Sequence, residues 1–292
     1  AAKRNKIRVA THYRDYWFCC PKSSLLRPDL KNCECCNIED LKHCSSKPRF
    51  LWNAYKIKYL KKIRSMLKTA DKKIAISNVV KEKLNLIGID DAVVVPNGVD
   101  LSLFRDVKEK HDFASTVIGY IGSLNYNKGL QNIIANVKNI LKGHKKTSFV
   151  VAGEGELKGK LADEFRDFGN RFVFKGIVNY NEIAGLFNEI DIVLIPSVWQ
   201  EPFNRVAIEA MAAGKPIIAS NVGGLRDIVK KDFGYLIEVG NNKEWEKAIE
   251  ILISQPVKRR LMGLNAIKEA KNYDINAIAR IVDKIYDGVL ER

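Results

Sequence analysis

Two glutamates, Glu201 and Glu209, stand eight residues apart in the stretch EPFNRVAIEAMAAGKP. A helix is predicted from Phe203 to Ala213, because Pro202 is tolerated in a first helical turn and Gly214 is a usual residue beyond a helix end. An acidic residue near a helix N-terminus often interacts only with the helix dipole, which accounts for Glu201. Glu209 lies beyond the first turn, so the dipole does not account for it.

The predicted helix start carries backbone amides that have no partner inside the helix. They belong to Phe203, Asn204, Arg205 and Val206, and such amides are a ready site for an anion. A carboxylate touching a bound diphosphate would be repelled, but flanking carboxylates could accept hydrogen bonds from sugar hydroxyls. Eight residues of helix span about 12 Å, which matches the reach across a pyrophosphate. The spacing therefore favours a nucleotide-sugar as the ligand.

From about residue 115 onward, strand and helix patterns alternate. Apolar runs such as IGYIG, FVVAG and IVLIP end in Gly or Pro, whereas GLQNIIANVKNILKG has apolar residues at helical spacing. The alternation predicts a doubly wound parallel sheet, in which ligands bind beyond the carboxyl ends of the strands. The turns of interest are 122–129, 152–156, 176–181 and 196–204.

The first part of the chain also has an α/β pattern, with three candidate strands in KIRVATHY, KKIAIS and DAVVVPNGVD. A long basic helix is predicted over FLWNAYKIKYLKKIRSMLKTA, with an apolar stripe that includes Trp52, Tyr59, Ile63 and Met66. We expect this stripe to pack into the domain and the lysines to face water. Contact of the helix with anionic lipid is the alternative.

The net charge of +15 is unevenly distributed along the chain. Residues 1–110 carry 24 Lys and Arg against 12 Asp and Glu, whereas residues 111–292 carry 25 against 22. The asymmetry indicates either an anionic partner for the first part or lysine-rich solvated faces. No apolar run approaches the roughly 18 residues that span a bilayer, and no secretory signal pattern is visible. A cytoplasmic location is therefore expected.

All six cysteines lie between residues 19 and 44. Cys33 and Cys36 form a C-x-x-C pair and, together with Cys20 and Cys44, could make a four-thiolate structural zinc site. Disulfide bonds are the alternative, favoured only in an oxidising compartment or a hyperthermophile.

Six motifs follow one another in the second part of the chain: GYIGSLNYNKGL, VVAGEGEL, FKGIV, DIVLIPS, the Glu-x7-Glu segment and GGLRDIV. Together they resemble the carboxyl domain of the family-four (group 1) retaining glycosyltransferases. That family has an α/β fold of two Rossmann-like domains facing across a cleft, the GT-B fold. VVVPNGVD resembles the family's interdomain segment, YDINAIARIVDKIY its final helix, and THYRDYWFCCPKSSLLRPDLKNCECC the DYW loop of a subset.

The resemblance implies a division into three segments. Residues 1–108 would be an acceptor-side domain with a Cys-rich loop, and residues 109–274 the domain that binds the nucleotide-sugar donor. Residues 275–292 would form a C-terminal helix that crosses back to the N-terminal domain. The family's usual amino-terminal part is expected to be missing, which would leave the N-terminal domain incomplete.

The resemblance also implies roles for matching residues. Glu209 resembles the ribose-binding glutamate, Glu201 the acid that holds the donor sugar's hydroxyls, and Lys128 the lysine on the diphosphate. Lys128 would neutralise charge that builds on the leaving group. His12 resembles a histidine near the reacting sugar, with Arg14 as the alternative at that position.

Some positions depart from the family pattern. Ser123 stands where the family often has an arginine, and Arg205 is a candidate substitute. Asn204 replaces a frequent glycine. Contacts to the base are expected near 153–155 and 176–178. The expected catalytic residues are thus Glu201, Lys128 and His12, and the expected donor-binding residues are Gly122, Ser123, Lys128, Gly153, Ile177, Phe203, Asn204, Arg205, Val206 and Glu209.

The reaction implied is transfer of a hexosyl group from a nucleotide-diphosphate sugar to a glycan, lipid-linked or small-molecule acceptor, with retention of configuration. No Asp-x-Asp pair suited to a metal on the diphosphate is present in the sequence. A reaction independent of metal and of any cofactor is therefore expected, with Lys128 and helix amides in the role of Mg²⁺. Partners would include the inner face of an anionic membrane, where the protein would be peripheral, but no nucleic acid. Two alternatives stay open: a nucleotide-sugar epimerase or phosphorylase of the same fold, and a catalytically inactive protein that binds anionic surfaces.

Overall fold

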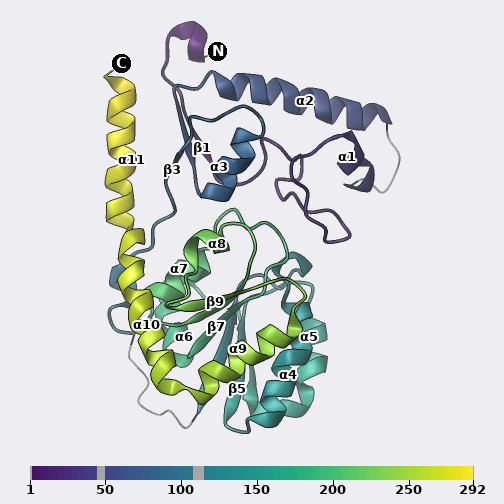
Figure 1. Cartoon of the computed structure of the whole chain (residues 1–292), viewed down its shortest axis with the longest axis vertical. Helices are drawn as coiled ribbons and strands as arrows, with labels where there is room; N and C mark the ends of the chain where they lie inside the picture. Colours follow the sequence, from purple (N-terminus) through teal and green to yellow (C-terminus); the bar gives the residue numbers. More distant parts are fainter. Residues whose placement is uncertain (1, 45–49, 108–114, 292) are drawn as a thin grey trace. The chain divides into compact units, whose positions relative to one another are not determined.

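The computed structural model describes residues 2–44, 50–107 and 115–291 of the chain (Figure 1). The chain divides into two compact units. The first comprises Ala1–Gly98, Trp199–Phe203 and Ile275–Arg292, and the second comprises Val99–Val198 and Asn204–Asp274. The predicted domain boundary between residues 108 and 109 lies outside the described residues.

The first unit is built on a three-stranded parallel sheet. Its strands lie in the order β1 (Ala10–Tyr13), β2 (Lys72–Ala75) and β3 (Val93–Val94). These are the three strands that the sequence predicts. Since all three run in the same direction, their carboxyl ends lie at one edge of the sheet.

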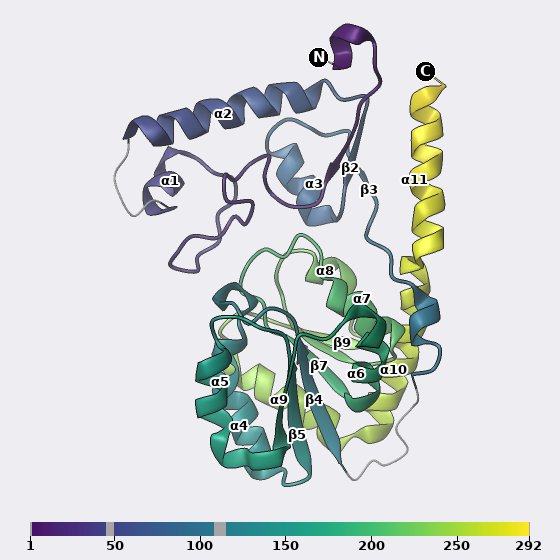
Figure 2. The same ribbon diagram turned by 180° about the vertical axis from the view of Figure 1, so that it is seen from behind.

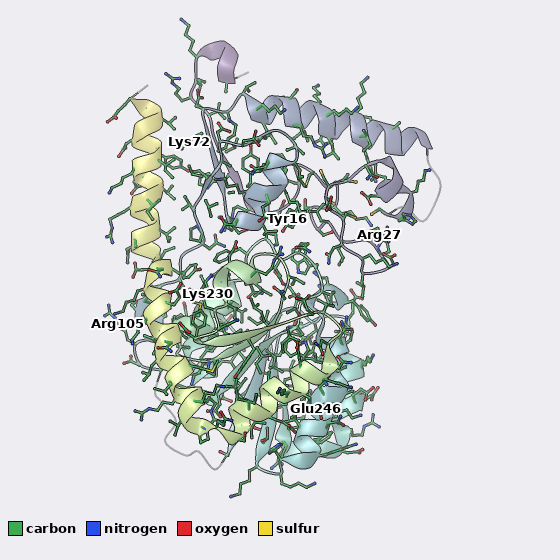
Figure 3. The ribbon with its side chains drawn as sticks, viewed as in Figure 1. Tyr16, Arg27, Lys72, Arg105, Lys230 and Glu246 are labelled. Atoms are coloured by element: carbon green, nitrogen blue, oxygen red, sulfur yellow. The ribbon has the colours of Figure 1, made fainter. Side chains whose placement is uncertain are left out.

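Among its described residues, the first unit contains the α-helices α1 (Ile38–Cys44), α2 (Phe50–Lys68), α3 (Asn78–Asn85) and α11 (Ile275–Leu290). The core under α3 includes the fully buried Tyr13, Phe18 and Tyr16, the last of which is labelled in Figure 3. Helix α11 contributes Ile278 to a second cluster with Ile74 of β2. The final helix of the chain therefore packs on the first sheet.

Helix α2 forms where the sequence predicts a helix, but it turns a different face inward. Leu60 and Leu67, seven residues apart, are buried, whereas Tyr59 and Met66 are exposed. The expectation that Tyr59 and Met66 pack into the domain is therefore wrong, because the leucine face is the one that reaches the interior. Ile63 is partly buried against the core, and the side chain of Trp52 lies outside the described residues.

The second unit is built on a six-stranded parallel sheet in the order β6-β5-β4-β7-β8-β9. The strands are β4 (Thr116–Ile121), β5 (Thr147–Ala152), β6 (Phe172–Gly176), β7 (Ile192–Ile195), β8 (Ile217–Ser220) and β9 (Gly234–Ile237). The chain builds the sheet outward from β4 to β6 and then resumes on the other side of β4 with β7. This order places a topological switch point between β4 and β7, as in a doubly wound Rossmann sheet. The predicted α/β class with parallel sheets is confirmed.

Helices cover both faces of the second sheet, with α4, α5 and α9 on one side and α6, α7 and α10 on the other (Figure 2). Their bounds are α4 (Ile134–Gly143), α5 (Lys158–Phe165), α6 (Ile183–Glu189), α7 (Arg205–Ala212), α8 (Leu225–Ile228), α9 (Asn242–Ser254) and α10 (Pro256–Ala270). Trp245 of α9 is buried in the main core of this unit. Within the described ranges, none of the helices combines the length and the apolar character needed to cross a lipid bilayer.

Candidate functional site

A cavity of about 290 Å³ opens at the carboxyl ends of β4 and β7. The loops that follow two strands flanking a switch point leave in opposite directions, which creates a crevice between them. The cavity is lined by Tyr120, Ile121, Gly122, Ser123, Lys128, Leu194, Ile195, Pro196, Ser197, Asn204 and Val206. Two loops and the start of one helix thus meet in one hollow of the second unit.

The loop after β4 is held against the loop after β5 by backbone contacts. The amide of Gly122 donates to the carbonyl of Ala152 at 2.9 Å, and that of Leu124 donates to Glu154 at 2.8 Å. At Gly153, where φ is +139°, an added Cβ would lie 1.8 Å from the carbonyl oxygen of Gly122. Only a glycine lets the two backbones approach this closely.

Lys128 reaches the cavity from the short 3-10 helix Tyr126–Lys128, and Gly129 ends that helix with a φ of +76°. A Cβ at Gly129 would lie 1.8 Å from the carbonyl oxygen of Pro196. The amide of Val198 also donates to the carbonyl of Asn127 at 3.0 Å. The loop that carries Lys128 is therefore fixed directly against the loop after β7.

Helix α7 begins with its N-cap, Asn204, at the cavity. The side-chain oxygen of Asn204 accepts a hydrogen bond from the amide of Ala207 at 3.0 Å, so α7 begins at Arg205. The predicted start at Phe203 is wrong by two residues, because Asn204 rather than Pro202 sets the helix start. The N-terminus of an α-helix favours an anion, and Val206 in the first turn of α7 lines the cavity.

Glu209 lies one turn further along α7 and is 6% exposed. Burial raises the pKa of its carboxyl to about 7, and the nearby Arg205 opposes that rise. Nη2 of Arg205 lies 3.6 Å from Oε1 of Glu209. The same guanidinium lies 5.4 Å from the ring centroid of Tyr180, in the turn after β6. At neutral pH the Glu209 carboxyl can therefore accept a hydrogen bond in one protonation state and donate one in the other.

Residues 104–269, more than half of the chain, match the family model described as glycosyl transferases group 1. The chain belongs to this family. An uncharacterised glycosyltransferase of Methanocaldococcus jannaschii is 31% identical over 69% of this chain and 55% of its own length. A glycogen synthase of Mycobacterium tuberculosis is 33% identical over 49% of this chain and 34% of its own. The chain thus spans about half, or less, of the curated relatives that it matches.

Solved glycosyltransferase structures share the fold. The crystal structure of Anabaena Alr3699/HepE in complex with UDP aligns with a TM-score of 0.74 and 19% sequence identity, over 98% of this chain and 74% of that one. The predicted GT-B class is confirmed by such neighbours.

The cavity of this group 1 glycosyltransferase brings together five of the residues expected to bind the donor. These are Gly122, Ser123, Lys128, Asn204 and Val206. Gly153, Arg205 and Glu209 belong to the same unit but do not line the cavity, and the side chain of Ile177 is 78% exposed.

The remaining expected residues belong to the first unit. Glu201 is buried, and its amide donates to the carbonyl of Trp199 at 2.8 Å. Phe203 packs on the hydrophobic core of the first unit. Nε2 of His12 lies 2.8 Å from the hydroxyl of Tyr286, and burial, followed by the charge of Arg14, lowers the pKa of His12.

The cysteine cluster does not support the predicted zinc site. All six cysteines lie within the described residues and are free thiols, and no group of three or more His, Cys, Asp or Glu side chains there is placed to hold a metal ion. Burial raises the pKa of both Cys33 and Cys36 to about 12, which opposes the thiolate form that zinc requires. The neighbouring Cys35 instead accepts a hydrogen bond from Nη2 of Arg64 at 3.2 Å.

Two features of this glycosyltransferase site are not among the residues that the sequence predicts. Pro196 and Ser197 line the cavity. They lie in the turn 196–204, which the sequence marks as a turn of interest, but neither is an expected donor-binding residue. The contact between Arg205 and Tyr180 joins residues far apart in the sequence. It depends on how the segments after β6 and β7 fold over the sheet, which no local pattern reports.

Proposed function

We propose that this glycosyltransferase takes a sugar from a nucleotide-diphosphate sugar and binds the diphosphate in the cavity between the ends of β4 and β7. The observation that carries the proposal is the convergence of Lys128 and the start of α7 on one cavity. A cation and helix amides are the groups that bind a diphosphate. Support also comes from the Anabaena neighbour, which has been crystallised with UDP and with UDP-glucose.

The sugar flanks the diphosphate on one side in this proposal, and the ribose on the other. Glu209 binds the ribose hydroxyls, since a buried carboxyl in a largely apolar helix is costly unless a ligand uses it. Glu201, three residues before the N-cap of α7, accepts hydrogen bonds from hydroxyls of the transferred hexose. Main-chain groups near Gly153 and Ile177 face the base.

The proposed reaction retains the anomeric configuration and needs no metal. The bond between the sugar's anomeric carbon and the diphosphate oxygen breaks, and the acceptor hydroxyl oxygen bonds to that carbon on the same face. The proton of the acceptor hydroxyl passes to the departing diphosphate oxygen. The ammonium of Lys128 and the amides of α7 stabilise the negative charge that develops on the diphosphate.

The acceptor is a glycan, a lipid-linked sugar or a small molecule, with His12 near the reacting sugar. In this proposal residues 1–108 with the helix 275–292 serve the acceptor side, and residues 109–274 serve the donor side. The protein acts at the inner face of an anionic membrane as a peripheral protein.

A thermal-shift screen against UDP-, GDP-, ADP- and CDP-sugars tests the donor site, because a ligand that binds the folded state raises the unfolding temperature. We expect the sugar nucleotides of one base to raise the unfolding temperature in a saturable way. The Lys128→Ala variant should lose that shift, whereas Lys145→Ala, an exposed lysine between α4 and β5, should keep it. Radiolabelled donor then separates transfer from epimerisation or phosphorolysis by the product. Failure of every nucleotide-sugar to shift the wild-type protein would contradict the proposal.

A further inference from the structure

Helix α2 presents a line of large side chains to solvent. Tyr55, Tyr59 and Met66 are 58%, 53% and 61% exposed. Spacings of four and seven residues place them on one face of the helix. The rings of Tyr55 and Tyr59 stack with centroids 6.4 Å apart and planes inclined by 17°. The stacked tyrosine pair and Met66, two turns further along, therefore share one exposed face, which we name the α2 ridge.

Contacts on a second face of α2 fix the orientation of the helix about its own axis. Leu60 and Leu67 are buried in the first unit. Arg64 donates from Nε to the carbonyl of Phe18 at 3.2 Å and from Nη2 to Cys35 at 3.2 Å. Because these contacts lie on a different face of the helix from the ridge, a rotation of α2 that buried the ridge would break all of them.

Within the first unit, α1, α3 and the strands all lie on the same side of α2 (Figures 1 and 2). A row of side chains projects from the opposite, outer side of the helix (Figure 3). The 19 residues of α2 correspond to about 28 Å of helix. The outer side is thus a long, straight surface.

The α2 ridge is bordered by positive charge. Lys58 and Lys62 are exposed and flank it at helical spacing, and Lys68 is exposed at the C-terminal end of the helix. The sequence of α2 contains five lysines and one arginine but no Asp or Glu. The α2 ridge thus combines apolar and aromatic side chains with positive charge only. Such a surface is complementary to an anionic interface with an apolar interior.

We propose that the α2 ridge and its bordering lysines dock the protein on an anionic lipid bilayer, with α2 lying in the plane of the membrane surface. Tyr55 and Tyr59 would sit at the level of the headgroups, where tyrosine is favoured. Met66 would enter the boundary of the acyl chains, and Lys58 and Lys62 would contact lipid phosphates. A nucleic acid would also attract the lysines, but it offers no apolar phase for Met66.

This inference rests on the peripheral membrane association included in the proposed function, and it names the surface responsible. Cosedimentation of the full chain with vesicles tests it directly. One set of vesicles is phosphatidylcholine alone, and the other contains about one third phosphatidylglycerol. We expect binding to the anionic vesicles at low salt, weaker binding at high salt because ions screen the lysines, and none to the neutral vesicles.

Two variants and a matched control locate the surface. Lys58→Gln/Lys62→Gln should weaken binding roughly 25-fold, since each lysine near an anionic surface contributes about a fivefold factor. Tyr55→Ser/Tyr59→Ser should weaken binding at both salt concentrations. Lys145→Gln/Lys146→Gln removes the same charge from an exposed position in the second unit and should leave vesicle affinity unchanged. Circular dichroism verifies that each variant is folded.

Three results would overturn the inference: absence of binding to anionic vesicles at low salt, equal losses in the control variant and the α2 variants, or displacement of vesicles by an RNA oligomer that binds α2 more tightly. Nucleotide-sugar binding is measured without vesicles, so the two proposals fail separately. A protein that binds donor but not vesicles contradicts the docking surface and the peripheral membrane association, and it leaves the donor site standing. A protein that binds vesicles but no nucleotide-sugar contradicts only the donor site.

Discussion

The guanidinium of Arg205 lies 3.6 Å from the buried carboxylate of Glu209, one turn apart on α7. The contact only partly offsets the cost of burial, because the pKa of Glu209 stays raised to about 7. Glu209 is thus held in a state that a ligand with hydroxyl groups would stabilise.

The raised pKa of Glu209 predicts a pH-dependent stability. The folded state holds the proton more tightly than the unfolded state, so the carboxyl favours folding at acidic pH, and this contribution is lost as the pH rises from about 4.5 to about 7. Above pH 7 the ionised Glu209 costs about 3 kcal/mol. Glu209→Gln should therefore gain stability relative to wild type as the pH rises. Urea unfolding of the two ligand-free proteins between pH 5 and 8 measures the difference in their free energies of unfolding. A difference that stays constant across that range would contradict a raised pKa at Glu209.

Arg205 is predicted to act on both Glu209 and the donor. Arg205→Ala should raise the pKa of Glu209 further, because the guanidinium now lowers it. The same variant should weaken nucleotide-sugar binding by about tenfold, the usual scale for one lost charge-assisted contact. Calorimetric titration measures the affinity, and Arg166→Ala, at an exposed position directly after α5, removes an equal charge as the control. Unchanged affinity in Arg205→Ala would remove Arg205 from the donor site.

The close approach of Gly129 to Pro196 predicts a stability cost for any side chain there. Gly129→Ala would force a Cβ against the Pro196 carbonyl oxygen at a positive φ, at a cost of about 2–4 kcal/mol. The control is Gly143→Ala at the end of α4, where a Cβ meets no atom within 4 Å, and which should be neutral or slightly stabilising. Thermal denaturation compares the stabilities of the Gly129→Ala and Gly143→Ala variants. Equal effects would mean that the loop carrying Lys128 is not fixed as described.

The capping role of Asn204 can be separated from its place in the cavity. Asn204→Ala removes the acceptor for the Ala207 amide and should cost about 1 kcal/mol of stability. Asn204→Asp retains the cap, so stability should be kept, but it places a negative charge in the cavity and should weaken binding of a diphosphate. Unfolding measurements give the stability of the two variants, and titrations with the donor give their affinity. An Asp variant that binds donor as well as wild type would argue against an anion beside Asn204.

Sequence patterns predicted the strands well, because buried parallel strands read as apolar runs between glycine-rich turns. Gly122, Lys128 and Asn204 were placed near the site for the same reason, since each follows a strand that ends at the switch point. The start of α7 was mispredicted because both Pro202 and Asn204 are good residues for a helix start, and only the hydrogen bond to Ala207 decides between them.

Other features depend on contacts that no local pattern contains. The inward face of α2 was misassigned because tyrosine, methionine and leucine all count as apolar, and burial of Leu60 and Leu67 was decided by the neighbouring core. The spacing of the cysteines allowed a zinc site, but spacing does not report burial, which raises the pKa of Cys33 and Cys36 and so opposes the thiolate form. The contact of Arg205 with Tyr180 joins segments that follow β7 and β6, which are not neighbours in the sheet, so no local pattern reports it.

The central claim is that Lys128 contacts the diphosphate of a bound nucleotide. Calorimetry of a nucleoside diphosphate and of its parent nucleoside, with wild type and Lys128→Ala, tests it most directly. Wild type should bind the diphosphate far more tightly than the nucleoside, and Lys128→Ala should lose about tenfold or more of that preference while its affinity for the nucleoside stays the same. An undiminished preference for the diphosphate in Lys128→Ala would contradict the account.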